Sequence, residues 1–393
     1  MRIAIVSCGL LDSLLPLVRR LSKHIEIDLY VSVYGTKFNE NVASFDLSNQ
    51  PTGLIDEATS RDIAGERLLS YIEGEGGKIG FRIFKYPDLK ILNRKNLQLH
   101  REFAKWLNQQ NYDAVHLNGY RGALMFLYGL IRRQTPKVWS IHDPILHSGE
   151  DKWQTRFAYS SFRFLKAHFV LHNQTQCPEF IERYSIEAQN CHYVPLGPLD
   201  IFQIFKNGGS ERTGRNVLFY GRISPYKGVE YLVEAARIVH QKMDDLKVVI
   251  AGKPNYAINL DPLKNEKGFE IKDHFIDNEE IVKMIEASEF VVCPYTDATQ
   301  SGVVMTAYAF HKPVLATAVG GLEEAVEEGA TGRLVPPRDP QALADAMLKM
   351  LTEEDALKGM EDTLKSRHQD GPYSWKGIAR ATLEIYQKAI ASY

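Results

Sequence analysis

The chain has 393 residues and a formal net charge of −2, with 44% hydrophobic and 24% charged residues. This length exceeds one ordinary core and predicts two domains of roughly 200 residues each. The composition is typical of a globular protein, and the near-neutral charge argues against a nucleic-acid partner. Residues 1–205 contain 24 Lys and Arg against 21 Asp and Glu, whereas residues 206–393 contain 23 against 28. The positive excess of the first half is mild and hints at an anionic surface or substrate there.

The cysteines and the apolar segments indicate a cytoplasmic protein. Cys8, Cys177, Cys191 and Cys293 form no C-x-x-C pair, so neither a metal site nor a disulfide framework is expected. The opening residues MRIAIVSCGLL form a short apolar run that Asp12 interrupts, and we interpret RIAIV as a buried first strand instead of a secretory leader. No run reaches about 18 apolar residues, so no transmembrane helix is expected.

The first half alternates predicted strands and helices. Apolar runs without polar alternation, separated by helical segments, are typical of a parallel sheet covered on both faces. Residues 50–80 are polar and are predicted as loop. The expected strands are 2–6, 25–33, 114–118, 137–143 and 168–173, with helices at 10–23 and 123–133.

A segment rich in Pro and Gly, residues 194–216, is the best linker candidate. After it the pattern restarts, with strands at 216–221, 246–252, 269–275 and 289–295 and helices at 229–243 and 278–288. We therefore predict an α/β fold of two Rossmann-like, doubly wound parallel-sheet domains, covering residues 1–200 and 201–372.

The last segment, residues 373–393, is predicted to be a helix. Gly371-Pro372 ends the preceding helix and Ser374 is a suitable N-cap. Its apolar positions share one helical face and must be buried against another element. Packing on its own domain is one solution, and we predict the other, that it packs back on the first domain. The apolar positions are Trp375, Ile378, Leu383, Tyr386 and Ile390.

The strongest chemical signal is LFYGRISPYKGVEYLVEAARIV, residues 218–239. A strand ends at Gly221, Arg222 follows, and Lys227 stands at the start of a helix. The two cations would point into the crevice at the carboxyl edge of the sheet, where such sheets bind ligands. Arginine can grip phosphate with two hydrogen bonds and lysine adds a point charge. A phosphate site is predicted, against the simpler alternative of two ordinary surface cations.

These residues belong to a longer set of motifs. GRISPYKG, VVIAGK, FVVCPY and HKPVLATAVGGLEEAVEEGATGRLVPPRDPQALADAM together resemble the donor-binding domain of retaining GT-B glycosyltransferases of family 4, the glycosyl transferases group 1. In the first half, VWSIHDP and HYVPLGP resemble the corresponding strands more loosely. The resemblance implies a GT-B fold and transfer of a sugar from a nucleotide-sugar donor to an acceptor hydroxyl with retention of configuration. The first domain would hold the acceptor and the second the donor.

The resemblance also implies roles for single residues. Arg222 and Lys227 match the cationic pair that stabilises charge on the leaving diphosphate, for which the family needs no metal or other cofactor. His142 matches a histidine that faces the donor sugar from the opposite domain, although a histidine that only caps a strand end is the competing interpretation. His147 and Glu150 are candidates for the acceptor side.

The segment ATQSGVVMTAYAFHKPVLAT, residues 298–317, departs from the family pattern. Two glutamates that usually contact the donor sugar and the ribose are replaced by Ala298 and Thr306. The segment still offers backbone amides and neutral side chains, which can bind a sugar or an anion. We expect donor contacts from Gln300, Ser301, Gly302, Val303 and Thr306.

The lost glutamates leave other functions open. One is a catalytically silent nucleotide-binding partner subunit, and another is a nucleotide-sugar epimerase of the same fold, for which no acid/base residues can be assigned. Two points favour transfer: the cationic pair is retained, and in this type of retaining reaction the leaving phosphate itself can accept the proton of the incoming hydroxyl. The expected role is assembly of a polysaccharide or glycolipid.

A membrane contact is suggested by TRFAYSSFRFLKAHFV, residues 155–170, where Arg156, Arg163 and Lys166 alternate with aromatic residues. A basic, aromatic helix of this kind can lie on an anionic membrane, which suits a lipid-linked acceptor at the inner face of the membrane. A core helix whose cations reach water is the alternative.

Overall fold

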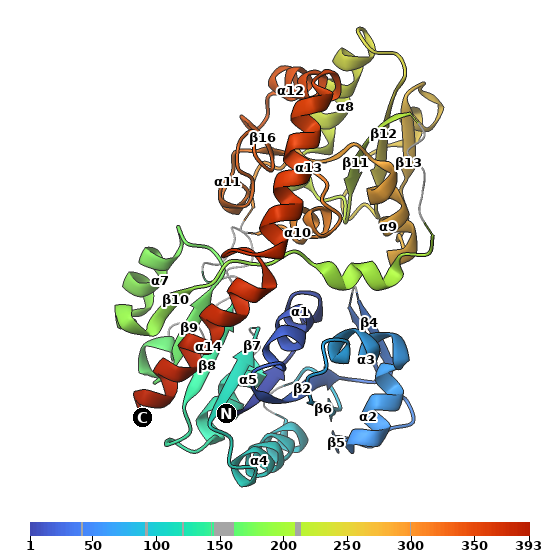
Figure 1. Ribbon diagram of the computed structural model, residues 1–393. Helices are drawn as coiled ribbons and strands as arrows, with labels where there is room; N and C mark the ends of the chain where they lie inside the picture. Colours follow the sequence, from blue (N-terminus) through green and yellow to red (C-terminus); the bar gives the residue numbers. More distant parts are fainter. Residues whose placement is uncertain are drawn as a thin grey trace. The chain divides into compact units, whose positions relative to one another are not determined.

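The protein is described from a computed structural model covering residues 1–40, 42–90, 93–119, 122–142, 144, 161–208, 214–298 and 300–393. Two compact units form (Figure 1): unit 1 is Met1–Leu196 with Trp375–Tyr393, and unit 2 is Gly197–Ser374. Each contains one mainly parallel sheet, as predicted. Among the helices of the described ranges, none has the length and apolar character needed to cross a bilayer.

The sheet of unit 1 has the strand order β10-β9-β8-β7-β1-β2-β6-β5. All neighbours are parallel except β5, which pairs antiparallel with β6. The order runs one way from β1 to β6 and the other way from β7 to β10, so the topological switch lies between β1 and β7, where ligands of such sheets bind. The strands are β1 (Arg2–Ser7), β2 (Glu26–Tyr34), β5 (Gly53–Leu54), β6 (Ile79–Tyr86), β7 (Ala114–Asn118), β8 (Lys137–Ile141), β9 (His168–Leu171) and β10 (Cys191–Tyr193).

The helices of unit 1 lie over the two faces and one end of this sheet (Figure 1). They are α1 (Leu11–Leu21), α2 (Glu57–Ala64), α3 (Glu66–Glu73), α4 (Arg94–Gln109), α5 (Gly122–Leu130) and α7 (Cys177–Tyr184), with short 3₁₀ helices η1 (Ser161–Phe164) and η2 (Ala188–Asn190). A separate hairpin joins β3 (Lys37–Glu40) and β4 (Ala43–Asp46).

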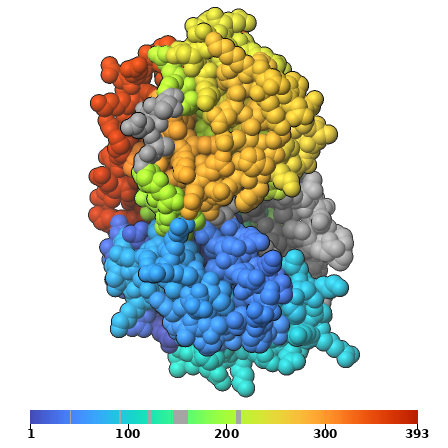
Figure 2. Space-filling model, turned by 90° about the vertical axis from the view of Figure 1, so that its right-hand side faces the viewer, coloured from blue at the N-terminus to red at the C-terminus, as the bar shows by residue number. Residues whose placement is uncertain are grey.

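The prediction of a loop at residues 50–80 is wrong, because β5, α2, α3 and the start of β6 lie there. Asp56 caps α2 by accepting a hydrogen bond from the amide of Thr59 at 2.9 Å. Few residues of α2 are apolar, but Ser60 is fully buried and its hydroxyl bonds the carbonyl of Ile55 and the amide of Ile83. Tertiary hydrogen bonds therefore hold a segment whose polar composition suggests a loop. The light-blue atoms of this part of the chain lie on the face of unit 1 that is turned to the viewer in Figure 2.

The C-terminal helix α14 (Trp375–Ala391) packs in unit 1 against α1, β7 and β8. Ile378 and Tyr386 are almost fully buried. The chain therefore leaves unit 1 after Leu196 and returns to it at Trp375, against boundaries predicted at residues 200 and 373.

Unit 2 has a six-stranded parallel sheet in the order β13-β12-β11-β14-β15-β16. Its topological switch lies between β11 and β14, whose carboxyl ends are at Tyr220 and Cys293. The strands are β11 (Arg215–Tyr220), β12 (Leu246–Ala251), β13 (Phe269–Lys272), β14 (Phe290–Cys293), β15 (Val314–Thr317) and β16 (Gly332–Val335).

Helices cover both faces of this sheet, and the apolar strand residues between them form one continuous core. They are α8 (Val229–His240), α9 (Asn278–Ala287), α10 (Gly302–Ala309), α11 (Gly321–Ala325), α12 (Pro340–Thr352) and α13 (Glu354–Gln369), with 3₁₀ helices η3 (Asp200–Phe205), η4 (Pro225–Lys227) and η5 (Asp261–Asn265).

From Gly197 onward, the described part of the predicted linker belongs to unit 2. Residues of η3 pack on α9 and α10, and Ile201 and Phe202 are buried there. The amide of Leu199 donates to the carbonyl of Met305 at 3.0 Å, and Gln203 donates to the carbonyl of Ala309 at 2.7 Å. The apolar residues between the Pro and Gly residues of this segment therefore pack on α10, the helix that follows β14 at the topological switch of unit 2.

Candidate functional site

The turn after β11 brings three parts of the predicted donor site together. Gly221 has a positive φ of 105°, which glycine adopts without strain. A Cβ at this position would lie 3.1 Å from Nζ of Lys227 and 3.5 Å from Cγ2 of Val303. The end of the strand, the lysine ammonium and the first turn of α10 therefore meet at one point, which has no room for a side chain at residue 221.

Lys227 is a buried cation without an acidic partner among the described residues. Its side chain is 8% exposed, and Nζ lies 5.0 Å from the centre of the Tyr295 ring. Burial lowers the pKa of Lys227 to about 8, the nearby Cys293 thiol opposes this shift, and the charge of Arg222 adds to it. A buried ammonium stabilised mainly by an aromatic face is a strong attractor for an anion.

Arg222 is exposed and makes no hydrogen bond or ion pair within the described part of the chain. The backbone beside it is fixed, because the amide of Ile223 donates to the carbonyl of Lys253 at 3.1 Å. Gly228 closes the turn with φ 62°, and a Cβ there would come within 2.1 Å of the carbonyl oxygen of Pro294. The guanidinium is therefore free to bind a ligand from a rigid turn.

The N-terminus of α10 is arranged as an anion site. The hydroxyl of Ser301 caps the helix by accepting a hydrogen bond from the amide of Val304, at 3.4 Å. The amides of Gly302 and Val303 belong to the first turn, where no carbonyl of the helix can bond them. Gly302 is exposed, and a Cβ there would contact only Leu199, at 3.8 Å. A phosphate could therefore approach these amides closely.

The two positions that lack glutamates lie inside unit 2. Thr306 is 3% exposed, and its hydroxyl donates to the carbonyl of Gly302 at 2.7 Å. Ala298 is 7% exposed, its carbonyl accepts from the amide of Gly321 at 3.1 Å, and a Cβ at Gly320 would lie 1.9 Å from that carbonyl oxygen. The donor capacity of Thr306 is thus used within its own helix, and its predicted contact with a ligand stays a prediction.

Two neighbouring polar side chains remain available. Gln300 is half-buried, and its Nε2 is buried without a hydrogen-bond partner among the described residues. Asp297 is exposed, and its carboxylate bonds none of the described residues. Asp297 was not predicted, although it directly precedes Ala298, one of the two positions that lack a glutamate.

His142, the predicted sugar contact, belongs to unit 1 and follows β8. It is held by a chain of hydrogen bonds at the switch point of that sheet. The hydroxyl of Ser7 donates to the carbonyl of Gly9 at 2.5 Å and accepts from Nδ2 of Asn118 at 3.2 Å, so Oδ1 of Asn118 faces Nε2 of His142 at 3.3 Å. Nε2 of His142 is therefore the donor and Nδ1 is left as an acceptor. Ser7 and Asn118 were not predicted, since their strands look like ordinary buried strands.

Burial and two neighbouring histidines keep His142 neutral. Burial lowers its pKa well below the usual value, and the nearby His172 and His116 lower it further. The rings of His142 and His172 are 4.7 Å apart, and Nε2 of His172 is buried without a partner in the described residues. A cavity of about 20 Å³ beside them has room for about one water molecule. A neutral His142 can accept a hydrogen bond at Nδ1, but it cannot act as an effective general acid.

The remaining predictions fall partly outside the described residues. His147, Glu150 and Arg156 lie there. Residues 161–164, within the segment predicted to be a basic helix, form only the 3₁₀ helix η1, in which Phe162 is fully buried. Within the described residues, no group of three or more His, Cys, Asp or Glu side chains could hold a metal ion.

Comparison with known families matches both halves of the chain. Residues 63–197 match the model of the glycosyltransferase family 4, and residues 214–353 match that of the glycosyl transferases group 1. The D-inositol 3-phosphate glycosyltransferase of Corynebacterium glutamicum is 28% identical over 244 residues. That match covers 57% of this chain and spans 57% of the relative's length.

Solved structures share the fold over the whole chain. The sucrose-phosphate synthase of Thermosynechococcus elongatus has a TM-score of 0.68 at 18% identity, with 100% of both chains covered. The Anabaena protein HepE in complex with UDP has a TM-score of 0.66 at 17% identity, with 99% of this chain and 100% of that chain covered. These likenesses concern the fold, which is GT-B. With both of its halves matched by the family models, the chain belongs to the family 4, or group 1, glycosyltransferases.

Proposed function

We propose that this protein transfers a hexose from a nucleotide-sugar donor to an acceptor hydroxyl with retention of configuration. The observation that carries the proposal is the buried Lys227 ammonium, which lies at the Gly221 turn between the exposed Arg222 and the first turn of α10. Two cations and unpaired helix amides at a topological switch point suit a diphosphate. The relatives named as glycosyltransferases and the UDP bound by HepE support this assignment.

The cations explain how the reaction could be accelerated. Negative charge grows on the diphosphate as the bond to the sugar breaks, and cations fixed beside it stabilise this transition state more than the ground state. Lys227 is buried, and the backbone beside Arg222 is fixed by the bond from the amide of Ile223 to the carbonyl of Lys253, so part of the site is in place before the ligand arrives. We propose that they supply the charge that a metal ion supplies in other phosphate chemistry, and that no metal is required.

The positions expected to contact the donor sugar lack the usual glutamates. This is compatible with retention if the acceptor hydroxyl attacks the sugar from the same face that the leaving phosphate departs from. The leaving phosphate can take the proton of the acceptor hydroxyl, so no enzyme carboxylate is required as the nucleophile or the base. Gln300 and the α10 amides can bond sugar hydroxyls, and the exposed Asp297 is an additional acceptor. His142 lies in unit 1, and its contact with the sugar stays a prediction.

The acceptor is proposed to be a carbohydrate or a lipid-linked molecule used in polysaccharide or glycolipid assembly at the cytoplasmic face of a membrane. The positive excess of the first half of the chain supports an anionic surface on that side. The acceptor would be held by unit 1.

Binding of nucleoside diphosphates tests the site before any acceptor is known. We expect thermal stabilisation by one member of a UDP, GDP, ADP and dTDP panel, and loss of most of this effect in Arg222→Ala and Lys227→Met. The matched control is Lys242→Ala, an exposed cation of unit 2 that follows α8. Undiminished binding by both site variants would refute the site.

Retention and the competing function need a second measurement. The anomeric configuration of the first product, read by NMR coupling constants, should equal that of the donor. The buried Ala298 and Thr306, which offer no carboxylate, favour the alternative of a silent nucleotide-binding subunit. Diphosphate binding with neither donor hydrolysis nor transfer across a panel of donors and acceptors would support that alternative.

A further inference from the structure

Helix α4 of unit 1 presents a stripe of cations to solvent. Arg94, Arg101 and Lys105 are exposed, and their spacing of seven and four residues places them on one face together with Gln98. The opposite face of the helix is buried through Leu99, Phe103 and Leu107. The outer face of a solvent-exposed helix often carries charges of both signs, whereas the charged residues of this stripe are all positive.

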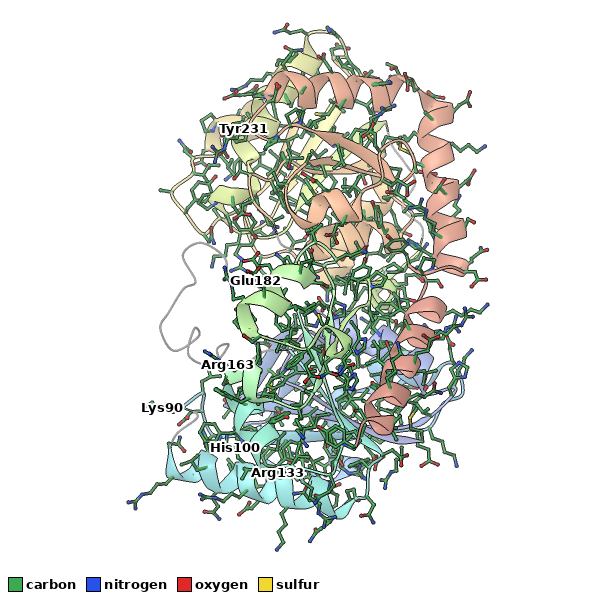
Figure 3. The ribbon with its side chains drawn as sticks, turned by 90° about the vertical axis from the view of Figure 1, so that its left-hand side faces the viewer. Lys90, His100, Arg133, Arg163, Glu182 and Tyr231 are labelled. Carbon is green, nitrogen blue, oxygen red and sulfur yellow. The ribbon has the colours of Figure 1, made fainter. Side chains whose placement is uncertain are left out.

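More exposed cations surround this stripe, and we call the set the α4 surface. Within the described residues none of them forms an ion pair. Some cations elsewhere in unit 1 are paired, as Arg20 and Lys23 are with Glu75 at 2.6 Å. Figure 3 labels Lys90 and Arg133 near α4 on the same side of unit 1. The cations of the α4 surface are Lys90, Arg94, Lys95, Arg101, Lys105, Arg132, Arg133 and Lys166.

Acidic groups are scarce on this surface. Glu102, on α4, is exposed and accepts a hydrogen bond from Gln98 at 2.8 Å. Asp88 is half-buried and bonds Asn93 and Asn96 at the start of the helix. Because salt bridges cancel little of the positive charge, the surface attracts anions over a distance of about one Debye length, roughly 8–10 Å.

Apolar side chains lie among these cations. Phe126 and Leu130, four residues apart on α5, are 38% and 37% exposed. The Phe126 ring lies 6.0 Å from that of His100 on α4, and Leu130 lines a groove with Arg101, Lys105 and Arg132. Leu89 and Phe164 are 62% and 79% exposed. This surface therefore combines large exposed apolar side chains with cations that form no ion pair among the described residues. Such a combination suits a partner whose anionic groups lie at the surface of an apolar layer.

We propose that the α4 surface docks on a membrane containing anionic lipids. The cations would bind lipid headgroup phosphates, and the apolar side chains would insert at the boundary with the acyl chains. A soluble polyanion would engage the cations but leave Phe126, Leu130 and Phe164 in water. The proposal rests on the proposed function in one respect, because a docked protein would meet a lipid-linked acceptor at the membrane surface. Binding of the protein to the membrane can be measured without any sugar transfer.

Vesicle co-sedimentation of the full chain tests the proposal. Wild-type protein should bind phosphatidylcholine vesicles that contain phosphatidylserine, bind poorly to pure phosphatidylcholine, and be released by high salt. The triple variant Arg94→Glu/Arg101→Glu/Lys105→Glu should bind at least about tenfold more weakly, since each cation near an anionic bilayer contributes favourably. Phe164→Ser should weaken binding to the anionic vesicles at low salt, because it removes an apolar side chain and no charge.

The control carries the same charge change on unit 2. Lys242→Glu/Lys349→Glu/Lys358→Glu replaces three exposed cations and should bind vesicles nearly as well as wild type. Both triple variants should keep their thermal shift with nucleoside diphosphate, which separates membrane binding from the donor site. Absence of binding to anionic vesicles, or equal binding by the two triple variants, would overturn the proposal. Binding to soluble polyphosphate but not to vesicles would assign the surface to a polyanion instead.

Discussion

The hydroxyl of Tyr386 lies 2.7 Å from Nδ1 of His116, which precedes it by 270 residues in the chain. Both side chains are buried, and the second ring nitrogen of His116 lies 2.8 Å from the hydroxyl of Ser140 on β8. Burial lowers the pKa of His116 to about 3, so the ring is neutral. Ser140 lies two residues before His142. Through His116 of β7, the C-terminal helix is therefore linked to β8, the strand that His142 follows.

Replacing Tyr386 by Phe should destabilise the protein by about 1–3 kcal/mol, because it leaves a buried nitrogen of His116 without its partner. Chemical denaturation of the variant would measure this loss. Tyr373→Phe is the matched control, since Tyr373 is 41% exposed and its hydroxyl bonds none of the described residues. Equal unfolding midpoints for the two variants would contradict a stabilising role for the His116–Tyr386 bond.

Gly302→Ala separates folding from ligand approach. The new methyl group would meet only Leu199, at 3.8 Å, and alanine favours the helix, so stability should be unchanged or raised by up to about 1 kcal/mol. If the donor phosphate approaches the α10 amides, the same methyl group should weaken diphosphate binding at least about tenfold. Calorimetric titration measures the affinity, and unaltered affinity would place the phosphate elsewhere.

The buried Lys227 predicts how diphosphate binding depends on pH. Its pKa in the free protein is lowered to about 8, and a bound diphosphate should raise that pKa because the opposite charge favours the ammonium. Binding then takes up a proton above pH 8, so the affinity should fall with rising pH by at most about tenfold per unit, and this contribution should level off just below pH 8. Lys227→Met should remove this dependence. A dependence that survives in the variant would exclude Lys227 as its source.

The lowered pKa of Lys227 also makes the free energy of unfolding depend on pH. The unfolded chain holds the proton of Lys227 up to the ordinary lysine pKa of 10.5, whereas the folded chain releases it near 8. Between these values the unfolded state binds more protons, so this group makes the free energy of unfolding rise with pH. The comparison of wild type with Lys227→Met in denaturation between pH 7 and about 10 isolates this contribution, and a rise that is equal in both proteins would contradict it.

Thr306→Val tests whether the replacement of a glutamate kept a polar role. The change removes one hydrogen bond, to the carbonyl of Gly302, which is local to α10, so stability should change by less than about 1.5 kcal/mol. We expect a modest loss of diphosphate affinity if the hydroxyl contacts the ribose. Retention of full affinity would show that Thr306 acts only inside its helix.

Local patterns in the sequence were sufficient for much of the fold. The buried parallel strands, the Gly221 turn with Arg222 and Lys227, and the apolar face of α14 are properties of short segments, in which periodicity and turn chemistry act directly. Residues 50–80 were misread because buried hydrogen bonds, such as those of Ser60, replace the apolar pattern there. The two replaced glutamates are likewise visible in the sequence.

The sequence by itself determined the doubly wound halves, the family resemblance and the cationic pair, because each depends on residues close together in the chain. Only the tertiary structure decided the surroundings of those residues. It buried Lys227 against Tyr295, enclosed Thr306 within unit 2, and set the tautomer of His142 through Asn118 and Ser7. These properties depend on burial and on partners more than 20 residues away, which local periodicity does not encode.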